Sequence, residues 1–431
     1  MLSDGGSMRY LQIEGGHRLA GKIEILGAKN SALPVLYATV LTRSVSVISN
    51  VPDISDVLTT LEILKRMGVI ITKIAENTYE IDTRNVDFCE APHRLVNSMR
   101  GSYYLLGAEL GRFGRAKLGE VGGCDFGERP IDQHIKVFRA LGATVNQTDS
   151  CIVMCADRLV GNRITFDVVS VGATVNAILC AVLAEGRTVL CNCAREPHVV
   201  DLCKYLLRCG AVISGAGTSK IIIDGVRSLS GSDFSLSPDM IEAGTYMALG
   251  SAIGEYIEIG GIEPSHLFCI YKTLVGAGAD IRMLDDKILV KGGSLHSVSV
   301  ETAPYPGFPT DMQPQLVAAM TTADGVSHIS ERVFKTRFRY VEQLSRLGAN
   351  VEVIGDTVTV YPSRLHGATV ETTDLRAGAA LVIGALCADG VSYVKNSDLI
   401  KRGYGDMCKK LVGIGAHVSE HETVSGDGVF P

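Results

Sequence analysis

The chain has 431 residues, of which 46% are apolar and 20% are charged, and its formal net charge is −6. This length and composition exclude a mini-protein that needs covalent cross-links and a charge-extended disordered chain. The slight acidic excess also argues against a general nucleic-acid-binding or anionic-membrane surface, so any anion site must be local.

The start of the chain and its cysteines predict a cytoplasmic location. MLSDGGSMRY has no apolar stretch behind a basic start, so we expect no secretory signal. No apolar run approaches the roughly 20 residues that cross a bilayer. The twelve cysteines include no Cys-x-x-Cys pair, and Cys191, Cys193, His198 and Cys203 match no zinc spacing. We therefore expect reduced core thiols in a cytoplasmic protein with no metal and no cofactor.

Glycine recurs at a regular interval along the chain. A helical stripe, a glycine and a β-branched strand follow one another six times, at nearly equal intervals of about 70 residues. Each glycine is predicted to end a helix in the left-handed conformation, with a strand directly after it. The six positions are Gly68, Gly142, Gly210, Gly278, Gly348 and Gly415.

A second series of six segments runs in step with the glycines. These segments are rich in small apolar residues, and each has a polar or charged residue near its start, which predicts a buried helix. They span 27–41, 98–110, 170–186, 237–254, 309–325 and 372–386. Alternating strands follow, for example at 45–51, 187–192 and 391–396. The predicted unit is strand, helix, strand, helix, strand, strand, used six times in an α/β fold.

Units of about 70 residues are too long for common solenoids, whose repeats have roughly 20–50 residues, so we expect closed domains. Three units per domain place the first domain at 29–237, with a loop at about 120–130. The second domain then comprises 1–28 plus 238–431, and the strand region near 9–25 joins it. Between two similar lobes we expect a cleft with charged groups at the helix starts.

The helix starts carry the candidate chemistry. Helix capping alone explains Asp, Ser and Thr there, and Thr310 to Gln313 spells a capping box. Capping does not explain Lys29 and Arg100, because a cation at a helix N-terminus is disfavoured without an anion nearby. These two residues predict an anionic ligand. The first-turn residues are Lys29, Asn30, Arg100, Ser170, Val171, Gly172, Asp239, Asp311, Asp374 and Arg376.

Two loops add further candidates. The glycine-rich stretch 121–134 carries Cys124, with Arg129 a few positions later, and a thiol near cations is either a reactive group or an exposed bystander. Asp125 and Glu128 flank it and should oppose thiolate formation. The loop 303–311 contains three prolines, which stiffen the approach to Asp311. Arg337 and Arg402 are candidate cations that would lie on the surface by default.

These segments resemble the UDP-N-acetylglucosamine enolpyruvyl transferase family, from about Tyr10 to Val418. The resemblance rests on GAKNSALP (27–34), GGCDFGERPIDQH (122–134), SVGATVN (170–176), AREPHVVDL (194–202), FPTDMQPQ (308–315), RFRYVEQLSRLGA (337–349), TTDLRAGAALV (372–382) and KRGYGDM (401–407). It implies two inside-out α/β barrel domains of three repeats each, which agrees with the glycine count. It also implies transfer of the enolpyruvyl group of phosphoenolpyruvate to the sugar 3-hydroxyl, with release of phosphate, in peptidoglycan synthesis.

The resemblance also implies roles for individual residues. Lys29, Arg129 and Arg402 would surround phosphoenolpyruvate, Cys124 would be the loop thiol that donates a proton, and Asp311 would face the sugar hydroxyl. Asp374 and Arg376 would complete the cleft. The remaining implied contacts to the UDP-sugar are Asn30, Arg100, Arg129, Pro130, Ile131, Asp132, Gln133, Ser170, Val171, Gly172, Asp311 and Val333. Valine stands at position 168, where a lysine is often found in the family.

Two alternatives remain at this stage. A shikimate-3-phosphate enolpyruvyl transferase would share the fold and the chemistry but lacks an equivalent loop cysteine. A non-catalytic UDP-sugar-binding paralogue would be favoured by loss of Cys124, Asp311 or Lys29, and all three are present. His134 is interpreted as a neighbour of a helix start. We expect small-molecule substrates, no nucleic-acid or membrane partner, and a monomer.

Overall fold

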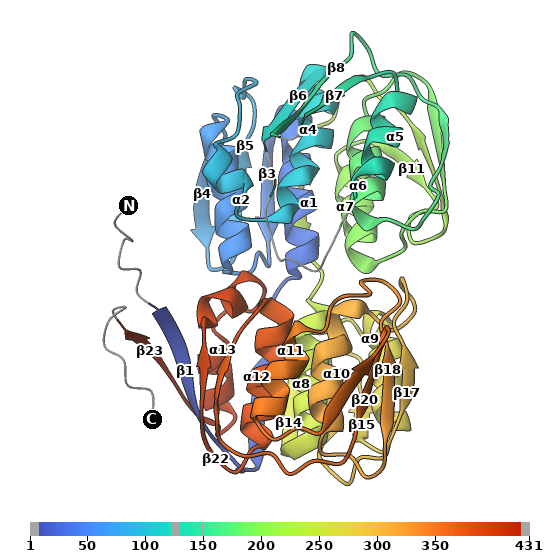
Figure 1. The fold of residues 1–431 in the computed structure, drawn as a ribbon. Helices are drawn as coiled ribbons and strands as arrows, with labels where there is room; N and C mark the ends of the chain where they lie inside the picture. Colours follow the sequence, from blue (N-terminus) through green and yellow to red (C-terminus); the bar gives the residue numbers. More distant parts are fainter. Residues whose placement is uncertain (1–7, 120, 122–129, 149, 424–431) are drawn as a thin grey trace, which may run out of the picture. The chain divides into compact units, whose positions relative to one another are not determined.

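The computed structural model describes residues 8–119, 121, 130–148 and 150–423 (Figure 1). The chain divides into two compact units. Unit 1 comprises Met1–Ile25 and Asp239–Pro431, and unit 2 comprises Leu26–Pro238. Unit 2 is therefore one continuous segment, whereas unit 1 is built from both ends of the chain.

Unit 2 repeats the predicted alternation of helices and strands. Its elements are α1 (Lys29–Ala38), η1 (Thr39–Thr42), β3 (Val45–Ser49), α2 (Ser55–Arg66), β4 (Ile70–Ala75), β5 (Thr78–Asp82), α3 (His93–Val96), η2 (Arg100–Tyr103), α4 (Tyr104–Phe113), β6 (Arg115–Gly119), α5 (Asp132–Ala140), β7 (Thr144–Gln147), β8 (Cys151–Cys155), β9 (Arg163–Thr165), α6 (Val171–Ala181), β10 (Arg187–Cys191), α7 (Pro197–Arg208), β11 (Val212–Ser214), β12 (Lys220–Asp224) and β13 (Asp233–Ser235).

The described strands of unit 2 form three small sheets, in the orders β13-β3-β5-β4, β6-β8-β7 and β11-β12-β10-β9. In two of these sheets one edge strand is parallel to its neighbour, and the remaining neighbours are antiparallel. The parallel pairs are β13 with β3 and β9 with β10. The sequence order of the strands explains this pattern, because a helix separates the parallel partners β9 and β10 while a short turn joins β11 to β12.

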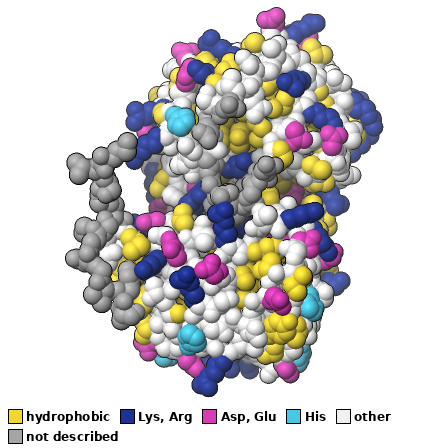
Figure 2. Space-filling model, in the orientation of Figure 1, with side chains coloured by type: hydrophobic (Ala, Val, Ile, Leu, Met, Phe, Trp, Pro, Cys, Tyr) yellow, Lys and Arg dark blue, Asp and Glu magenta, His cyan; other side chains and the backbone are white. Residues whose placement is uncertain are grey.

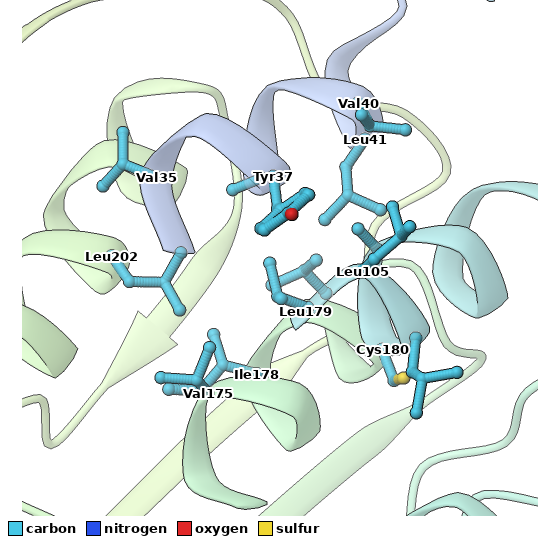
Figure 3. Packing of buried hydrophobic residues seen from close by; sticks show 14 of the residues in the cluster. Val35, Tyr37, Val40, Leu41, Leu105, Val175, Ile178, Leu179, Cys180 and Leu202 are labelled. Atoms are coloured by element: carbon cyan, nitrogen blue, oxygen red, sulfur yellow. The ribbon is translucent and has the colours of Figure 1, made fainter. Parts of the chain in front are cut away.

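The core of unit 2 lies around helices α1, α4 and α6. Figure 3 shows Tyr37 of α1 surrounded by apolar side chains, including Leu105 of α4 and Leu179 of α6. These side chains are fully buried. Helices α4 and α6 approach closely at Gly107, where an added Cβ would lie 2.6 Å from Oδ1 of Asn176. The small residues seen in the sequence therefore permit close helix packing.

Unit 1 has the same alternation. Its elements are β1 (Met8–Gly15), β2 (Leu19–Glu24), α8 (Met240–Ile253), β14 (Gly254–Gly260), α9 (Pro264–Gly276), β15 (Asp280–Met283), β16 (Lys287–Lys291), β17 (Ser299–Glu301), η3 (Thr310–Met312), α10 (Gln313–Met320), β18 (Ser327–Ser330), α11 (Arg339–Arg346), β19 (Val351–Ile354), β20 (Thr357–Val360), β21 (Thr369–Glu371), α12 (Leu375–Cys387), β22 (Gly390–Lys395), η4 (Ser397–Arg402), α13 (Met407–Gly413) and β23 (His417–Thr423).

The sheets of unit 1 are β15-β16-β14-β2, β17-β18-β20-β19 and β21-β22-β1-β23. Helices α8, α10 and α12 pack against one another, as Figure 1 shows within this unit. The N-terminal strand β1 lies between β22 and β23 and is antiparallel to both. The last sheet is therefore completed by the first strand of the chain.

The six periodic glycines all adopt the left-handed conformation. Their φ angles are 88° at Gly68, 100° at Gly142, 98° at Gly210, 91° at Gly278, 90° at Gly348 and 88° at Gly415. Each follows a helix and precedes a strand, as in α2, Gly68 and β4. The prediction of six glycine helix stops is confirmed, because this conformation disfavours residues that carry a Cβ.

Several cysteines of the described residues pack as buried thiols, which include Cys180, Cys193, Cys203 and Cys209. Burial raises the pKa of Cys203 to about 12, so this thiol stays protonated at neutral pH.

No helix among the described residues is long and apolar enough to cross a membrane. On the face shown in Figure 2, basic and acidic side chains are mixed with one another.

Candidate active site

Lys29 begins α1 and has a buried counterion. Its side chain is 11% exposed, and Nζ lies 2.6 Å from Oδ2 of Asp56, whose side chain is 6% exposed. Asp56 lies in the first turn of α2. We predicted from the helix start that a ligand anion lies beside Lys29, and the chain itself places a carboxylate there. Asp56 was not foreseen, because it lies on a different helix and resembles an ordinary first-turn acid.

Arg100, His134 and Gly172 come together in unit 2. The Arg100 guanidinium lies 5.1 Å from the centre of the Tyr103 ring, and burial lowers the pKa of Arg100. Burial, with the nearby charge of Arg100, lowers the pKa of His134 to about 4, so this imidazole is neutral at pH 7. An added Cβ on Gly172 would lie 2.6 Å from Nε2 of His134. Glycine at the start of α6 therefore lets the start of α5 approach it.

Other candidate residues in unit 2 form hydrogen bonds at the starts of α5 and α6. Nε2 of Gln133 donates to Asp132 at 2.8 Å and to Asp167 at 3.0 Å, while Oε1 of Gln133 accepts from the Asp167 amide at 2.9 Å. Ser170 is the N-cap of α6 and accepts from the Ala173 amide at 3.3 Å. Pro130 and Val168 are exposed, Ile131 is buried, and Asn30 and Val171 are half-buried.

In unit 1 two arginines hold Asp311. Oδ1 of Asp311 accepts from Arg337 at 2.8 Å, and Oδ2 accepts from Arg376 at 3.1 Å. Burial opposes ionisation of Asp311, but the charges of Arg376 and Arg337 outweigh it and hold the pKa of Asp311 well below its usual range. Both arginine side chains are 2% exposed, whereas that of Asp311 is 29% exposed. The result is an ionised, oriented carboxylate that solvent or a ligand can reach.

Glu331 fixes the backbone around Asp311. It is fully buried and accepts four hydrogen bonds. Two come from the hydroxyls of Thr302 at 2.8 Å and Thr310 at 2.9 Å, and two come from the amides of Val333 at 2.8 Å and Phe334 at 2.9 Å. Arg337 also donates to the Thr310 carbonyl at 3.1 Å. Glu331 thus ties the segment that carries Arg337 to the segment that carries Asp311.

This arrangement corrects the capping box predicted at 310–313. Neither η3 nor α10 has a side-chain cap, since the Thr310 hydroxyl donates to Glu331 instead. Two other aspartates are caps as expected. Asp239 accepts from two amides at the start of α8, and Asp374 accepts from the amides of Arg376 and Ala377 at the start of α12.

Arg376 is a buried residue of the Asp311 cluster. Its guanidinium lies 5.2 Å from the centre of the Tyr404 ring, and the Tyr404 hydroxyl contacts Thr245 and Gln315 at 2.9 and 3.0 Å. Arg402 lies at the end of η4 and is half-buried, and Val333 is 38% exposed.

In unit 2 the structure brings Arg100, His134 and Gly172 together and separately pairs Lys29 with Asp56, and in unit 1 it brings Asp311, Arg337 and Arg376 together. Cys124 and Arg129, with Asp125 and Glu128, lie outside the described residues. Sequence reasoning missed Asp56 and Glu331, and it left Arg337 as a surface residue by default, although Arg337 is 3% exposed. The position of Arg337 just before α11 carries no signal of burial, because its partner Asp311 lies on a separate, earlier element.

Comparisons with known proteins decide the family. Residues 13–411 match the family model described as EPSP synthase (3-phosphoshikimate 1-carboxyvinyltransferase). The chain is 44% identical to UDP-N-acetylglucosamine 1-carboxyvinyltransferase 2 of Bacillus subtilis, covering 95% of this chain and 96% of the relative. It is 46% identical to UDP-N-acetylglucosamine 1-carboxyvinyltransferase 3 of Caldanaerobacter subterraneus, covering 95% and 99%. The chain belongs to the UDP-N-acetylglucosamine 1-carboxyvinyltransferase family.

Solved structures agree with this enolpyruvyl transferase fold. The enolpyruvyl transferase NikO from Streptomyces tendae has a TM-score of 0.89 at 28% identity, covering 97% of this chain and all of the other. An EPSP synthase from Acinetobacter baumannii has a TM-score of 0.74 at 18% identity, covering 96% and 100%, which shows a common fold. The resemblance predicted from the sequence motifs is confirmed.

Proposed function

We propose that this transferase moves the enolpyruvyl group of phosphoenolpyruvate to the 3-hydroxyl of UDP-N-acetylglucosamine and releases phosphate, in the cytoplasm and in peptidoglycan synthesis. The proposal rests on enzymes named for this sugar nucleotide, to which the chain is 44–46% identical along 95% of its length. The alternative, shikimate 3-phosphate as acceptor, is less well supported, because the likeness to the EPSP synthase structure is at 18% identity.

The reaction requires an acid, a hydroxyl-orienting group and cations. Protonation of the enolpyruvyl methylene creates an electrophilic carbon, and the sugar hydroxyl attacks this carbon while its proton passes to a base. The tetrahedral adduct then loses a methyl proton and phosphate, which restores the double bond. We assign the proton donor to Cys124, and we assign the binding of phosphoenolpyruvate to Lys29, Arg129 and Arg402.

Asp311 is suited to orient the sugar hydroxyl. Oδ2 accepts two hydrogen bonds from Arg376, whereas Oδ1 accepts one from Arg337, so one lone pair of Oδ1 remains for a hydroxyl donor. A carboxylate whose pKa is held this low is a weak base. We infer that Asp311 aligns the hydroxyl for attack and that full proton abstraction by Asp311 requires one arginine to release it.

The sugar nucleotide is assigned to the helix starts of unit 2. The amides at the start of α6 suit a diphosphate, because helix N-termini favour anions. Gln133 and Ser170 use their side chains within the protein, and the Ser170 carbonyl accepts from Thr174, so we assign the contacts of these two residues with the ligand to their backbone amides. The proposed contacts from unit 2 are Asn30, Arg100, Arg129, Pro130, Ile131, Asp132, Gln133, Ser170, Val171 and Gly172. Those proposed from unit 1 are Asp311 and Val333, with Asp374 and Arg376 supporting Asp311.

At the level of the fold, we propose two domains, 29–237 and 1–28 plus 238–431, each an inside-out α/β barrel, in a protein that acts as a monomer. Each unit has three sheets among its described residues, α8, α10 and α12 pack against one another in unit 1, and α1 and α6 both pack against α4 in unit 2, which supports this proposal.

A phosphate-release assay tests the function. Phosphoenolpyruvate with UDP-N-acetylglucosamine should release phosphate, whereas phosphoenolpyruvate with shikimate 3-phosphate should not. Release with shikimate 3-phosphate alone would overturn the acceptor assignment. No release with either, despite measurable binding of the sugar nucleotide, would instead indicate a non-catalytic paralogue.

The cysteine assignment has its own test. Cys124→Ala should largely abolish turnover at neutral pH and remove any covalent adduct detected by intact-protein mass spectrometry after incubation with phosphoenolpyruvate. Cys155→Ala, at an exposed thiol of β8, serves as the matched control. Unchanged phosphate release in Cys124→Ala would show that another group donates the proton.

A further inference from the structure

Two histidines and one glutamate meet at an edge of unit 1 that the proposed reaction does not use. Glu14 lies near the end of β1, His17 follows β1, and His417 begins β23. One possible ligand atom from each of the three residues lies within 4.8 Å of the others. Their side chains are 41–58% exposed, so an ion in solution can reach them.

The fold brings these residues together by strand register and a turn. Glu14 is the direct cross-strand partner of His417 in the antiparallel pair β1–β23. Gly16 then turns the chain with a φ of 82°, and its amide donates to the Leu386 carbonyl at 3.0 Å. This turn places His17 beside His417, and the centres of their rings are 4.3 Å apart. The backbone, rather than long flexible side chains, sets the three positions.

The spacing of the donor atoms fits a metal ion. Nε2 of His17 lies 3.3 Å from Oε1 of Glu14, and Nδ1 of His417 lies 3.6 Å from Oε2. Imidazole nitrogens and carboxylate oxygens bind zinc at about 2.0–2.2 Å, so tetrahedral ligands are about 3.3–3.6 Å apart. The two distances above, which run to the two different oxygens of Glu14, match this spacing, and one donor atom from each residue lies within 4.8 Å of the others. Two imidazoles and one carboxylate suit zinc and its neighbours in the transition series.

We propose that Glu14, His17 and His417 form a binding site for one divalent transition-metal ion, with water at the remaining coordination position. The bound ion links the first strand of the chain to the last strand of the same sheet. Exposed glutamate–histidine pairs alone stabilise a fold very little, whereas an ion that binds the folded state stabilises it by mass action. The sequence alone predicted no metal site. The three proposed ligands come from opposite ends of the chain, so they have no local spacing that could have predicted one.

Cobalt is a suitable probe because it reports its ligands. The full chain, stripped with a chelator, is titrated with Co²⁺ and followed by visible absorption. We expect one equivalent of bound cobalt with d–d bands and without the ultraviolet charge-transfer band of thiolate ligands, which distinguishes this site from the cysteines. His17→Ala and His417→Ala should each weaken binding at least tenfold. His421→Ala, on the same strand, should bind like the unaltered chain.

Zn²⁺ should raise the unfolding temperature of the unaltered chain and of His421→Ala, but not that of His17→Ala. Because the three positions are exposed, circular dichroism of the metal-free variants should match that of the parent. Absence of cobalt binding, a thiolate band at one equivalent, or equal affinity in all variants would each overturn the proposal. None of these results depends on the enolpyruvyl transfer.

Discussion

The ammonium of Lys29 and the carboxylate of Asp56 form an ion pair at 2.6 Å, with little exposure of either side chain. The distance matches that of the surface pair Arg187–Asp224, also 2.6 Å, whose side chains are 65% and 40% exposed. The two pairs therefore differ chiefly in burial, and burial decides how much the loss of one partner costs.

Asp56→Asn should destabilise the protein by about 3–5 kcal/mol, because it leaves the buried Lys29 charge without this counterion. Asp224→Asn should cost no more than about 1 kcal/mol. Urea unfolding of both variants measures the difference, and Lys29→Met with Asp56→Asn should recover part of the loss. Equal effects of Asp56→Asn and Asp224→Asn would contradict this account.

Arg337→Met should change the pH dependence of turnover. With both arginines present, Asp311 stays ionised throughout the accessible range, and the stabilisation from its ionisation is lost only as pH falls through the lowered pKa. Without Arg337, less positive charge offsets the effect of burial on the carboxyl, so the pKa of Asp311 rises. An acidic limb set by Asp311, which the parent lacks within the accessible pH range, should therefore appear in the kcat profile of Arg337→Met. Arg339→Met, at an exposed position on the same segment, should leave the profile unchanged.

Glu331→Gln should lower kcat about tenfold or more, with a smaller effect on the KM of the sugar nucleotide. The amide loses the negative charge that four donors share, so the segments carrying Asp311 and Arg337 are less firmly aligned. Glu301→Gln, which removes an exposed partner of Arg332, is the control. A change confined to thermal stability, with kcat intact, would assign Glu331 a structural role only.

Glu109→Gln should be more stable than the parent at alkaline pH. Glu109 is fully buried in α4, and burial raises its pKa from 4.5 to about 8. The folded state therefore holds a proton that the unfolded chain has lost, so stability falls as pH rises from about 4.5 to about 8. The neutral amide avoids this loss, which amounts to about 1.4 kcal/mol per pH unit.

Denaturant unfolding near pH 5 and near pH 8 checks the Glu109 prediction. The stability difference between Glu109→Gln and the parent should grow by about 3–4 kcal/mol across this interval. Glu62→Gln, which alters an exposed helical ion pair, should show no such trend. A constant difference across the interval would mean that Glu109 is ionised in the folded protein.

Local chemistry explains which features could be predicted from sequence. The six glycine helix stops and the caps at Ser170, Asp239 and Asp374 depend on residues close to the helix ends. Such short-range preferences are visible in a single sequence. The strand–helix order of the repeats follows from periodicity for the same reason.

Long-range pairing explains what could not be predicted. Asp311 has the sequence context of a cap, yet its partners are Arg337 and Arg376, which lie 26 and 65 residues away. Thr310 is drawn from the expected capping box to Glu331, 21 residues later. In each case a buried charge outweighs a local preference worth about 1 kcal/mol.

Strand β1 completes the last sheet of unit 1 by pairing with β22 and β23. During synthesis on the ribosome, the continuous unit 2 emerges whole while most of unit 1 is still to be made, so it can fold first. The N-terminal strand must wait until its C-terminal partners have been translated. Unit 1 can therefore complete this sheet only after β22 and β23 have been made, and removal of β23 should leave β1 without one of its two neighbours.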